Sequence, residues 1–245
     1  NNLLKNKKLT FKEQIIINKL KENGRIYSAL QYQASRVAAR ITLEHFNIYS
    51  LNSILNDSFG APQFPSNVSG SISHKNNFVL CGIIPLETSS SSNNNNNYNN
   101  NNKDNDNVKK NIYVGVDIEQ LGRKNTPKRL GERILTENEL KRLGCSGLTI
   151  EDEILLRFSL KESVYKAIFP FVKKHIPFKD VEVEPTNDGF ASIKPLFPIT
   201  PSLKLTGYYQ LYKDNDQEQL YCVSGVVIEN IVDIPQDNTQ INSVI

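Results

Sequence analysis

The chain has 245 residues, of which 38% are hydrophobic and 22% charged, a composition typical of a soluble globular protein with one large or two small domains. Its 29 basic and 26 acidic residues give a formal net charge of +3, which is too small to indicate nucleic-acid binding by itself. Cys81, Cys145 and Cys222 form no CxxC pair, so we expect reduced thiols in the cytoplasm rather than disulfides or a zinc site. No apolar run is long enough to predict a membrane span or a signal peptide.

The first predicted element is a helix over residues 32–46, YQASRVAARITLEHF. Its apolar residues recur at i, i+3, i+4 and i+7, which predicts one buried stripe. These residues are Ala34, Val37, Ala38 and Ile41. Arg36 and Arg40 are then expected on the opposite face.

A low-complexity segment divides the chain. Residues 89–107 are Ser/Asn-rich and nearly free of apolar side chains, which predicts disorder. Its flanks, NNFVLCGII before and NIYVGVDIE after, are typical of strands, and the simplest expectation is a hairpin with the insertion at its tip. We therefore expect an N-terminal lobe over 1–88 and a C-terminal lobe over 108–245. The absence of methionine indicates a segment of a longer protein.

The C-terminal part combines helices and strands. Thr136 followed by Glu139 has the spacing of a helix-capping box, and a second helix contains RFSLKESVYKAI at 157–168. Four later segments are typical of antiparallel strands: FKDVEVEP, GFASIKP, LKLTGYYQLY and QLYCVSGVVI. The predicted fold class is therefore α+β.

Two acidic residues stand two positions apart in the predicted strand YVGVDIEQ. Asp117 and Glu119 should project from the same face of that strand, which suits a hard divalent cation such as Mg²⁺. A solvated polar face at the end of a strand is the competing interpretation, since such pairs are common.

Glu162 and Lys166 lie four residues apart on the predicted helix, so they are neighbours on its surface. They would form a surface ion pair worth about 0.3 to 0.5 kcal/mol. Alternatively, Glu162 would supply a third carboxylate to a metal ion and Lys166 would bind phosphate beside it. Lys161 precedes Glu162, and helical geometry alone does not place it.

The segments VGVDIE and FSLKESVYK, with Lys161 44 positions after Asp117, together resemble the paired signature of 4′-phosphopantetheinyl transferases. In that family a G-[VI]-D-x-E strand precedes an aromatic-S-x-K-E-[SA]-x-x-K helix. GSISHK at 70–75 is similar to the family's S-H segment. The motifs lie on both sides of the midpoint of the chain, and this layout is similar to that of the two-lobed, monomeric branch of the family.

The resemblance implies two similar α/β lobes in a pseudo-two-fold arrangement, with the active site between the lobes. It implies transfer of 4′-phosphopantetheine from coenzyme A to a serine of an apo acyl or peptidyl carrier protein, with release of 3′,5′-ADP. Mg²⁺ is the implied cofactor, and coenzyme A and the carrier protein are the implied partners. We expect a cytoplasmic monomer with no nucleic-acid or membrane partner.

By motif position, the resemblance implies Asp117, Glu119 and Glu162 as metal ligands. It makes Glu162 the candidate base for the attacking serine. Lys166 and Lys161 would stabilise charge on the pyrophosphate as catalytic residues.

The coenzyme A site is also implied by motif position. His74 stands where the family has a histidine near the 3′-phosphate, with Ser73 beside it. Arg40 aligns best with the arginine that binds the same phosphate, and Arg36 is the reserve candidate. Ala61 stands where many relatives have a basic residue, a contact that Lys75 would replace.

Three alternatives stay open. Glu139 matches a further acidic position of the family or is a capping residue. A basic cluster is a docking surface for an acidic carrier protein or a solvated loop: Arg123, Lys124, Lys128, Arg129 and Arg133. The chain as a whole would otherwise be an inactive module that binds coenzyme A or a carrier, or, less in keeping with its net charge, a nucleic-acid binder.

Overall fold

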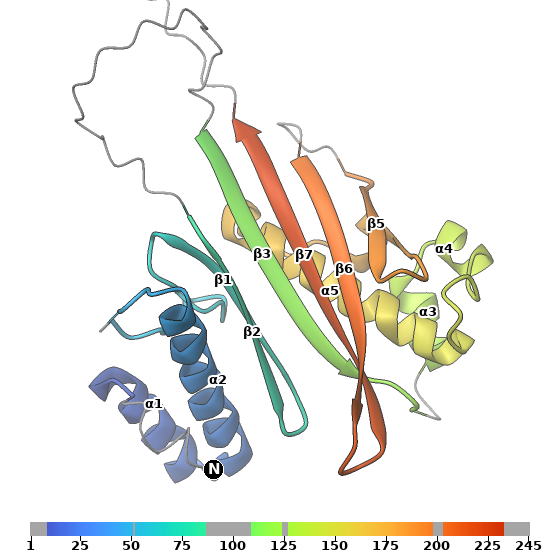
Figure 1. Cartoon of the computed structure of the whole chain (residues 1–245). Coiled ribbons are helices and arrows are strands. Elements are labelled where there is room, and N and C mark those ends of the chain that lie inside the picture. The colour runs from blue at the N-terminus through green and yellow to red at the C-terminus, as the bar shows by residue number, and fades with distance from the viewer. Residues whose placement is uncertain (1–8, 51, 87–108, 124–126, 198–202, 233–245) are drawn as a thin grey trace, which may run out of the picture.

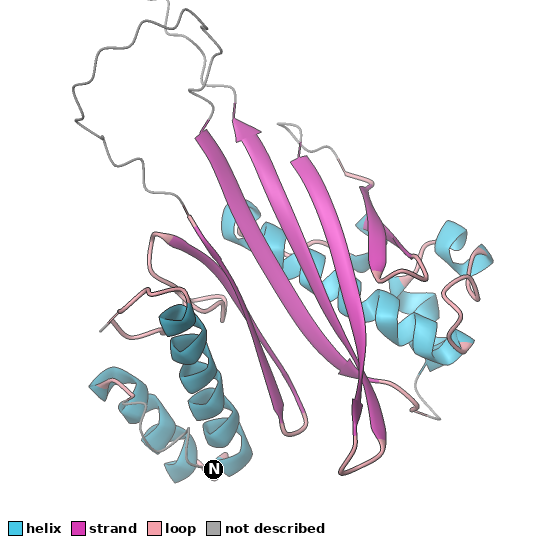
Figure 2. Cartoon of the chain, viewed as in Figure 1, coloured by secondary structure: helices cyan, strands magenta, loops and turns pink. Residues whose placement is uncertain are grey.

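A computed structural model describes residues 9–50, 52–86, 109–123, 127–197 and 203–232 (Figures 1 and 2). The helices are α1 (Phe11–Glu22), α2 (Ile26–His45), α3 (Pro127–Ile134), α4 (Glu137–Lys141), α5 (Ile150–Val172) and the 3-10 helix η1 (Phe178–Asp180). The strands are β1 (Val68–Lys75), β2 (Phe78–Pro85), β3 (Lys109–Gln120), β4 (Val181–Pro185), β5 (Phe190–Pro195), β6 (Leu203–Asp214) and β7 (Gln219–Val232). None of the described helices is both long and apolar enough to cross a membrane.

In the N-terminal lobe, residues 9–86, α2 packs against the antiparallel pair β1–β2 and α1 packs against α2. A two-residue turn joins these strands, because Lys75 pairs with Phe78. Asn76 in this turn has a φ of 51°, a left-handed conformation that asparagine tolerates better than most residues. The turn therefore fixes β2 beside β1.

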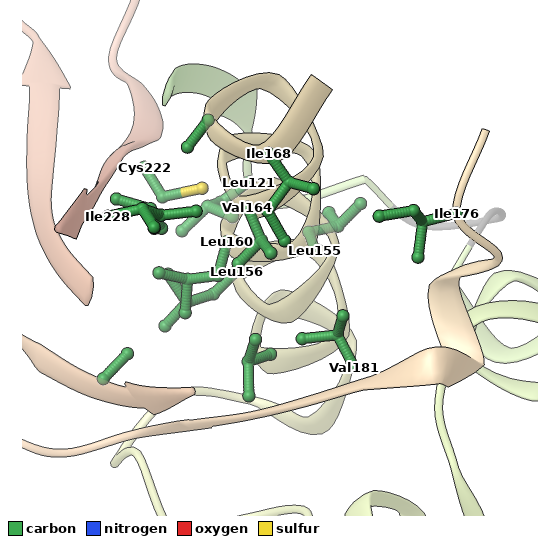
Figure 3. Close-up of a cluster of buried hydrophobic side chains, with 14 residues drawn as sticks. Leu121, Leu155, Leu156, Leu160, Val164, Ile168, Ile176, Val181, Cys222 and Ile228 are labelled. Atoms are coloured by element: carbon green, nitrogen blue, oxygen red, sulfur yellow. The ribbon is translucent and has the colours of Figure 1, made fainter. Parts of the chain in front are cut away.

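The C-terminal lobe, residues 109–232, is a five-stranded sheet of order β3-β7-β6-β5-β4. The long helix α5 lies across one face of this sheet, as Figure 1 shows. Leu156, Leu160 and Val164 of α5 meet Val226 and Ile228 of β7 in the main core, part of which Figure 3 shows. Each of these side chains is almost fully buried.

Helix α5 approaches β3 most closely at Gly115. A Cβ atom at this position would lie 1.9 Å from the carbonyl oxygen of Ser163 and 2.6 Å from the backbone nitrogen of Ala167. Neither backbone atom can move without moving the helix. Glycine is therefore required for α5 to lie this close to the strand.

The two lobes meet along β1 and β3. The hydroxyls of Ser69 and Ser71 accept hydrogen bonds from the backbone N–H groups of Val114 and Val116, at 2.9 and 3.1 Å. Both lobes thus consist of a long helix on an antiparallel sheet, although the sheets differ in size. The predicted α+β fold of two lobes is confirmed.

The predicted hairpin around residues 89–107 is wrong. Both flanking segments are strands, but β2 pairs with β1 and β3 pairs with β7. The short turn at Asn76 brings β1 to β2, while β7 offers β3 a twelve-residue antiparallel partner. The insertion itself lies outside the described residues, and the proposed lobe boundaries stay predictions.

The predicted helix over 32–46 is confirmed and begins earlier, at Ile26, but its buried face differs from the prediction. Ile41 is 38% exposed, whereas Arg36 and Arg40 are 4% and 9% exposed. The face that carries these arginines packs inward because buried acceptors satisfy both guanidinium groups. The four later strands and the capping box at Thr136 agree with prediction.

Candidate active site

Asp117 lies at the junction of the lobes and is 5% exposed. Its Oδ1 accepts hydrogen bonds from Ser73 Oγ and Lys166 Nζ, both at 2.7 Å, and its Oδ2 accepts one from Ser159 Oγ at 2.9 Å. Three donors from β1 and α5 therefore hold one carboxylate of β3. The predicted proximity of Asp117 and the α5 motif is confirmed.

Glu119 occupies the same face of β3 two residues later. Lys75 Nζ lies 3.0 Å from Oε1 and 2.7 Å from Oε2, and Arg123 donates to Oε2 at 3.1 Å. Lys75 was expected to contact coenzyme A, but the structure directs it to Glu119. Arg123 likewise binds this carboxylate, with its side chain 30% exposed.

The rest of the predicted basic cluster is not a loop. Lys128, Arg129 and Arg133 belong to helix α3, and Lys124 lies outside the described residues. The docking prediction for this cluster stays a prediction.

Glu162 is half-buried on α5 and faces the two acids of β3. Burial raises the pKa of its carboxyl above the ordinary value, Asp117 and Glu119 raise it further, and Lys166 and His175 oppose the shift. The three predicted ligands are thus close enough for their charges to interact. A cation placed among them would relieve this repulsion.

Lys166 connects the acids to a cleft that is otherwise lined by residues of the N-terminal lobe. Its Nζ donates to Asp117 Oδ1 at 2.7 Å, to Ser73 Oγ at 3.0 Å and to the carbonyl of Val116 at 3.1 Å. Lys166 does not form the surface ion pair with Glu162 that the helix spacing allowed. Among the described residues, its charge is bound by Asp117 instead.

The cleft has a volume of about 620 Å³. Ser73, His74 and Lys166 line one side, and two arginines, Arg25 and Arg36, line it from α2 and its start. The guanidinium carbon of Arg36 lies 4.0 Å from the centre of the Tyr32 ring. A concave site with several cations and few acids suits a ligand rich in phosphate.

Arg40 is directed elsewhere. Its Nη2 donates to Glu13 Oε1 of α1 at 2.9 Å, and Glu13 also accepts from the backbone of Ile54 at 2.9 Å. Burial alone would raise the pKa of Glu13, but the bonds from Arg40, Thr10 and Ile54 outweigh it and lower the pKa. Arg40 ties α1 to α2. The reserve candidate Arg36 lines the cleft, but its guanidinium donates to the carbonyl of Ile54 at 2.6 Å and to Asn56 Oδ1, and its role in binding coenzyme A stays a prediction.

Lys161 is 2% exposed and points to a different face of α5. Its Nζ lies 2.7 Å from Glu139 Oε2 and 2.7 to 2.9 Å from the carbonyls of Ile134, Phe178 and Val181. Burial lowers the pKa of this ammonium, and Glu139 opposes the shift. The structure therefore does not bring Lys161 to the acids of β3, and its predicted catalytic role has no geometric support.

Glu139 is fully buried and serves the fold. It caps α4 through Thr136, binds Lys161, and accepts a hydrogen bond from the backbone of Val183 at 2.9 Å. The capping interpretation of Glu139 is thus confirmed.

Within the described ranges, no three His, Cys, Asp or Glu residues are arranged to hold a metal ion. The donor chemistry nevertheless fits Mg²⁺, because Asp117, Glu119 and Glu162 offer hard carboxylate oxygens. Asp117 and Glu119 already bind the ammonium groups of Lys166 and Lys75, so this region favours positive charge. The residues present therefore fit a divalent cation in charge and ligand type.

Three contributors were missed at the level of sequence. Arg25 lines the cleft from the residue before α2, and Ser159 and Ser224 form buried hydrogen bonds behind Asp117. Ser159 belongs to the α5 motif, so its position in the sequence pointed to the site. Ser224 lies 65 residues away on β7, and no pattern in the sequence connects it to the site.

Two family models match the chain. Residues 113–222 match the 4′-phosphopantetheinyl transferase superfamily model, and residues 30–83 match the model of a 4′-phosphopantetheinyl transferase N-terminal domain. The first contains Asp117, Glu162 and Lys166, and the second contains Arg36 and Ser73. Each lobe is thus matched independently.

Curated relatives agree with these models. Enterobactin synthase component D of Escherichia coli K12 is 28% identical over 137 residues, which are 56% of this chain and 53% of that protein. The chain therefore aligns with about half the length of that relative. The holo-[acyl-carrier-protein] synthase of Borrelia garinii subsp. bavariensis is 30% identical over 127 residues, 48% of this chain and 98% of that protein.

A solved structure, the apo-ACPS of Chronobacterium ammoiniagenes, covers 51% of this chain and all of its own, with 18% identity and a TM-score of 0.35. The residues matched by the two family models meet at the junction of the lobes. With both lobes matched and the acids of β3 facing the α5 motif, the chain belongs to the 4′-phosphopantetheinyl transferase superfamily.

Proposed function

We propose that the protein transfers the 4′-phosphopantetheine group of coenzyme A to a serine of an apo acyl or peptidyl carrier protein, acting as a monomer with Mg²⁺ as cofactor. One observation carries the proposal: Lys166 and Ser73 contact Asp117 and also line the basic cleft. The acids that suit a divalent cation and the cations that suit phosphate therefore meet at one place. The family membership of the chain supports the same activity.

The basic residues and the acidic residues of the site would have different roles. Arg25 and His74 would bind the phosphates and nucleotide of coenzyme A, and Lys166 would stabilise charge on the pyrophosphate. Arg36, whose guanidinium already binds Ile54 and Asn56, would add positive charge to the wall of the cleft. Asp117, Glu119 and Glu162 would hold Mg²⁺, which when bound supplies charge neutralisation during phosphoryl transfer. Lys161 has no part in the transfer.

In the proposed transfer, one P–O bond forms and one breaks. The carrier serine oxygen attacks the pantetheine-side phosphorus of coenzyme A, and the P–O bond to 3′,5′-ADP breaks. Glu162 receives the serine proton. In the metal-free protein, burial raises the pKa of the Glu162 carboxyl above its ordinary value, which favours uptake of a proton.

The test is incubation with coenzyme A, Mg²⁺ and a panel of acyl, peptidyl and aminoadipate-reductase-type apo carriers, followed by intact-mass measurement. A carrier should gain the mass of one phosphopantetheine group, and Asp117→Ala and Glu162→Ala should abolish the gain. No gain with any carrier would reject the transferase proposal. Full activity in either variant would reject the role of that carboxylate.

The second candidate is a module that binds coenzyme A or a carrier without turnover. It is favoured by the two cationic side chains, Lys75 and Arg123, that engage Glu119. Isothermal calorimetry separates the candidates, because coenzyme A binding with no modified carrier would support the binding module.

A further inference from the structure

Three buried serines form a hydrogen-bonded chain behind Asp117. Ser159 and Ser163 of α5 are fully buried, and Ser224 of β7 is 1% exposed. The Oγ atoms of Ser159 and Ser224 are 2.8 Å apart, as are those of Ser224 and Ser163. Ser159 Oγ reaches Asp117 Oδ2 at 2.9 Å, so the chain connects the α5–β7 interface to the site.

The direction of these hydrogen bonds follows from the number of protons. An ionised Asp117 only accepts, so Ser159 must donate its single hydroxyl proton to Oδ2. Ser224 must then donate to Ser159. Ser163 donates to Ser224, whose Oγ lies 2.8 Å and whose carbonyl oxygen lies 3.3 Å from Ser163 Oγ. The hydroxyl dipoles of Ser159 and Ser224 therefore point toward one carboxylate oxygen, and one strengthens the other.

The surroundings of the chain are apolar. Val164 and Ala167 of α5 and Val226 and Ile228 of β7 form the main core beside these serines. Burying hydroxyls in such a core costs free energy unless every hydrogen bond is made. Alanine would fill the same space without polar groups, so the hydroxyls point to a role at the carboxylate that they address.

We propose that Ser159, supported by Ser224 and Ser163, is a positioning residue that orients Asp117 so that Oδ1 faces the cleft. Oδ1 is the atom bound by Ser73 and Lys166, which both line the cleft. Fixing Oδ2 from behind leaves Oδ1 in one orientation for a cation, the usual effect of groups that hydrogen-bond a metal ligand. This inference rests on the proposed function, because it assigns Asp117 to cation binding.

The test is Mn²⁺ titration of the 245-residue chain, with free Mn²⁺ measured by electron paramagnetic resonance. Ser159→Ala should weaken Mn²⁺ binding about 10-fold, and Ser159→Thr, which keeps the hydroxyl, should restore it. The matched control is Ser146→Ala, which removes a buried hydroxyl 2.8 Å from another carboxylate, that of Glu153. Its Mn²⁺ affinity should equal that of the wild type.

Wild-type affinity in Ser159→Ala, or an equal loss in Ser146→Ala, would overturn the inference. If Ser159→Ala fails to fold, Ser224→Ala breaks the same chain and should also weaken binding. If the wild type binds no Mn²⁺, the metal part of the proposed function fails, and crystal structures decide the inference separately. An unchanged Asp117 side chain in Ser159→Ala would then refute it, and a rotated one would support it.

Discussion

Helix α5 has two polar faces with similar residue types but different surroundings. On the first face, Arg157 and Lys161 are fully enclosed and bind Glu153, Glu139 and backbone carbonyls. On the second face, Ser159, Glu162 and Lys166 meet the acids of β3 at the edge of a cleft. The presence of a lysine or glutamate in the motif therefore does not show that it belongs to the site. Its burial and its partners decide whether it stabilises the fold or faces the cleft.

The largest expected effect is on the enclosed face. Lys161→Met would leave Glu139 buried without its cation and three carbonyls without a donor. We expect a loss of about 3 to 5 kcal/mol in the free energy of unfolding, measured by urea denaturation. A loss below about 1 kcal/mol would show that this ion pair does not stabilise the fold.

The same substitution on the second face should affect activity instead. Lys166→Met removes a cation from the cleft, and we expect the transfer rate to fall about 100-fold. Its side chain is 26% exposed, and Asp117 keeps the hydroxyls of Ser73 and Ser159 as donors. The loss in the free energy of unfolding should therefore be smaller than that of Lys161→Met. The control is to measure both methionine variants by carrier mass shift and by urea denaturation. If Lys166→Met lost as much stability as Lys161→Met, the two faces of α5 would not differ in the way described.

Glu153 tests the enclosed face by its pH dependence. Burial alone would raise its pKa, but hydrogen bonds from Arg157 and Ser146 outweigh burial and lower it below the ordinary 4.5. Its stabilisation is therefore present above pH 4.5 and lost as the pH falls through the lowered value. Glu153→Gln should cost about 2 kcal/mol of unfolding free energy at neutral pH, and the difference from wild type should narrow in acid.

Unfolding curves of wild type and Glu153→Gln across this range provide the measurement. A difference that stays constant with pH would contradict the assignment of a lowered pKa to Glu153.

Glu162 should give the smallest effect on stability, and in the opposite direction. Its pKa is raised, chiefly by burial, so its contribution to stability is present in acid and lost as the pH rises through the raised value. In buffer with EDTA at neutral pH, Glu162→Gln should therefore be at least as stable as the wild type. Thermal unfolding measures this, and a loss as large as that of Glu153→Gln would disprove it.

Much of the fold and part of the site were predictable from local patterns. Alternation in β3 placed Asp117 and Glu119 on one face, and the α5 motif supplied Glu162 and Lys166. The direction of Lys161 was not predictable, because a helix does not specify which neighbours its other faces meet. The pairing of β3 with β7 and the contact with Ser224 also depend on residues far apart in the chain, which no local period encodes.

The burial of Arg36 and Arg40 escaped prediction for a related reason. Hydropathy patterns assign arginine to solvent, whereas Glu13, Ile54 and Asn56 supply buried acceptors that only the folded lobe brings together.

The close contact at Gly115 sets the spacing of the whole site. Any side chain there would lift α5 away from β3 and widen the gap between Asp117 and the α5 motif, although every acid and lysine would remain. A protein could then keep every acid and lysine of the two segments and yet hold them too far apart to act together. The glycine that precedes the two acids of β3 thus sets the distance between the two segments of the candidate site, and a search for relatives with the same site should require it as strictly as the carboxylates.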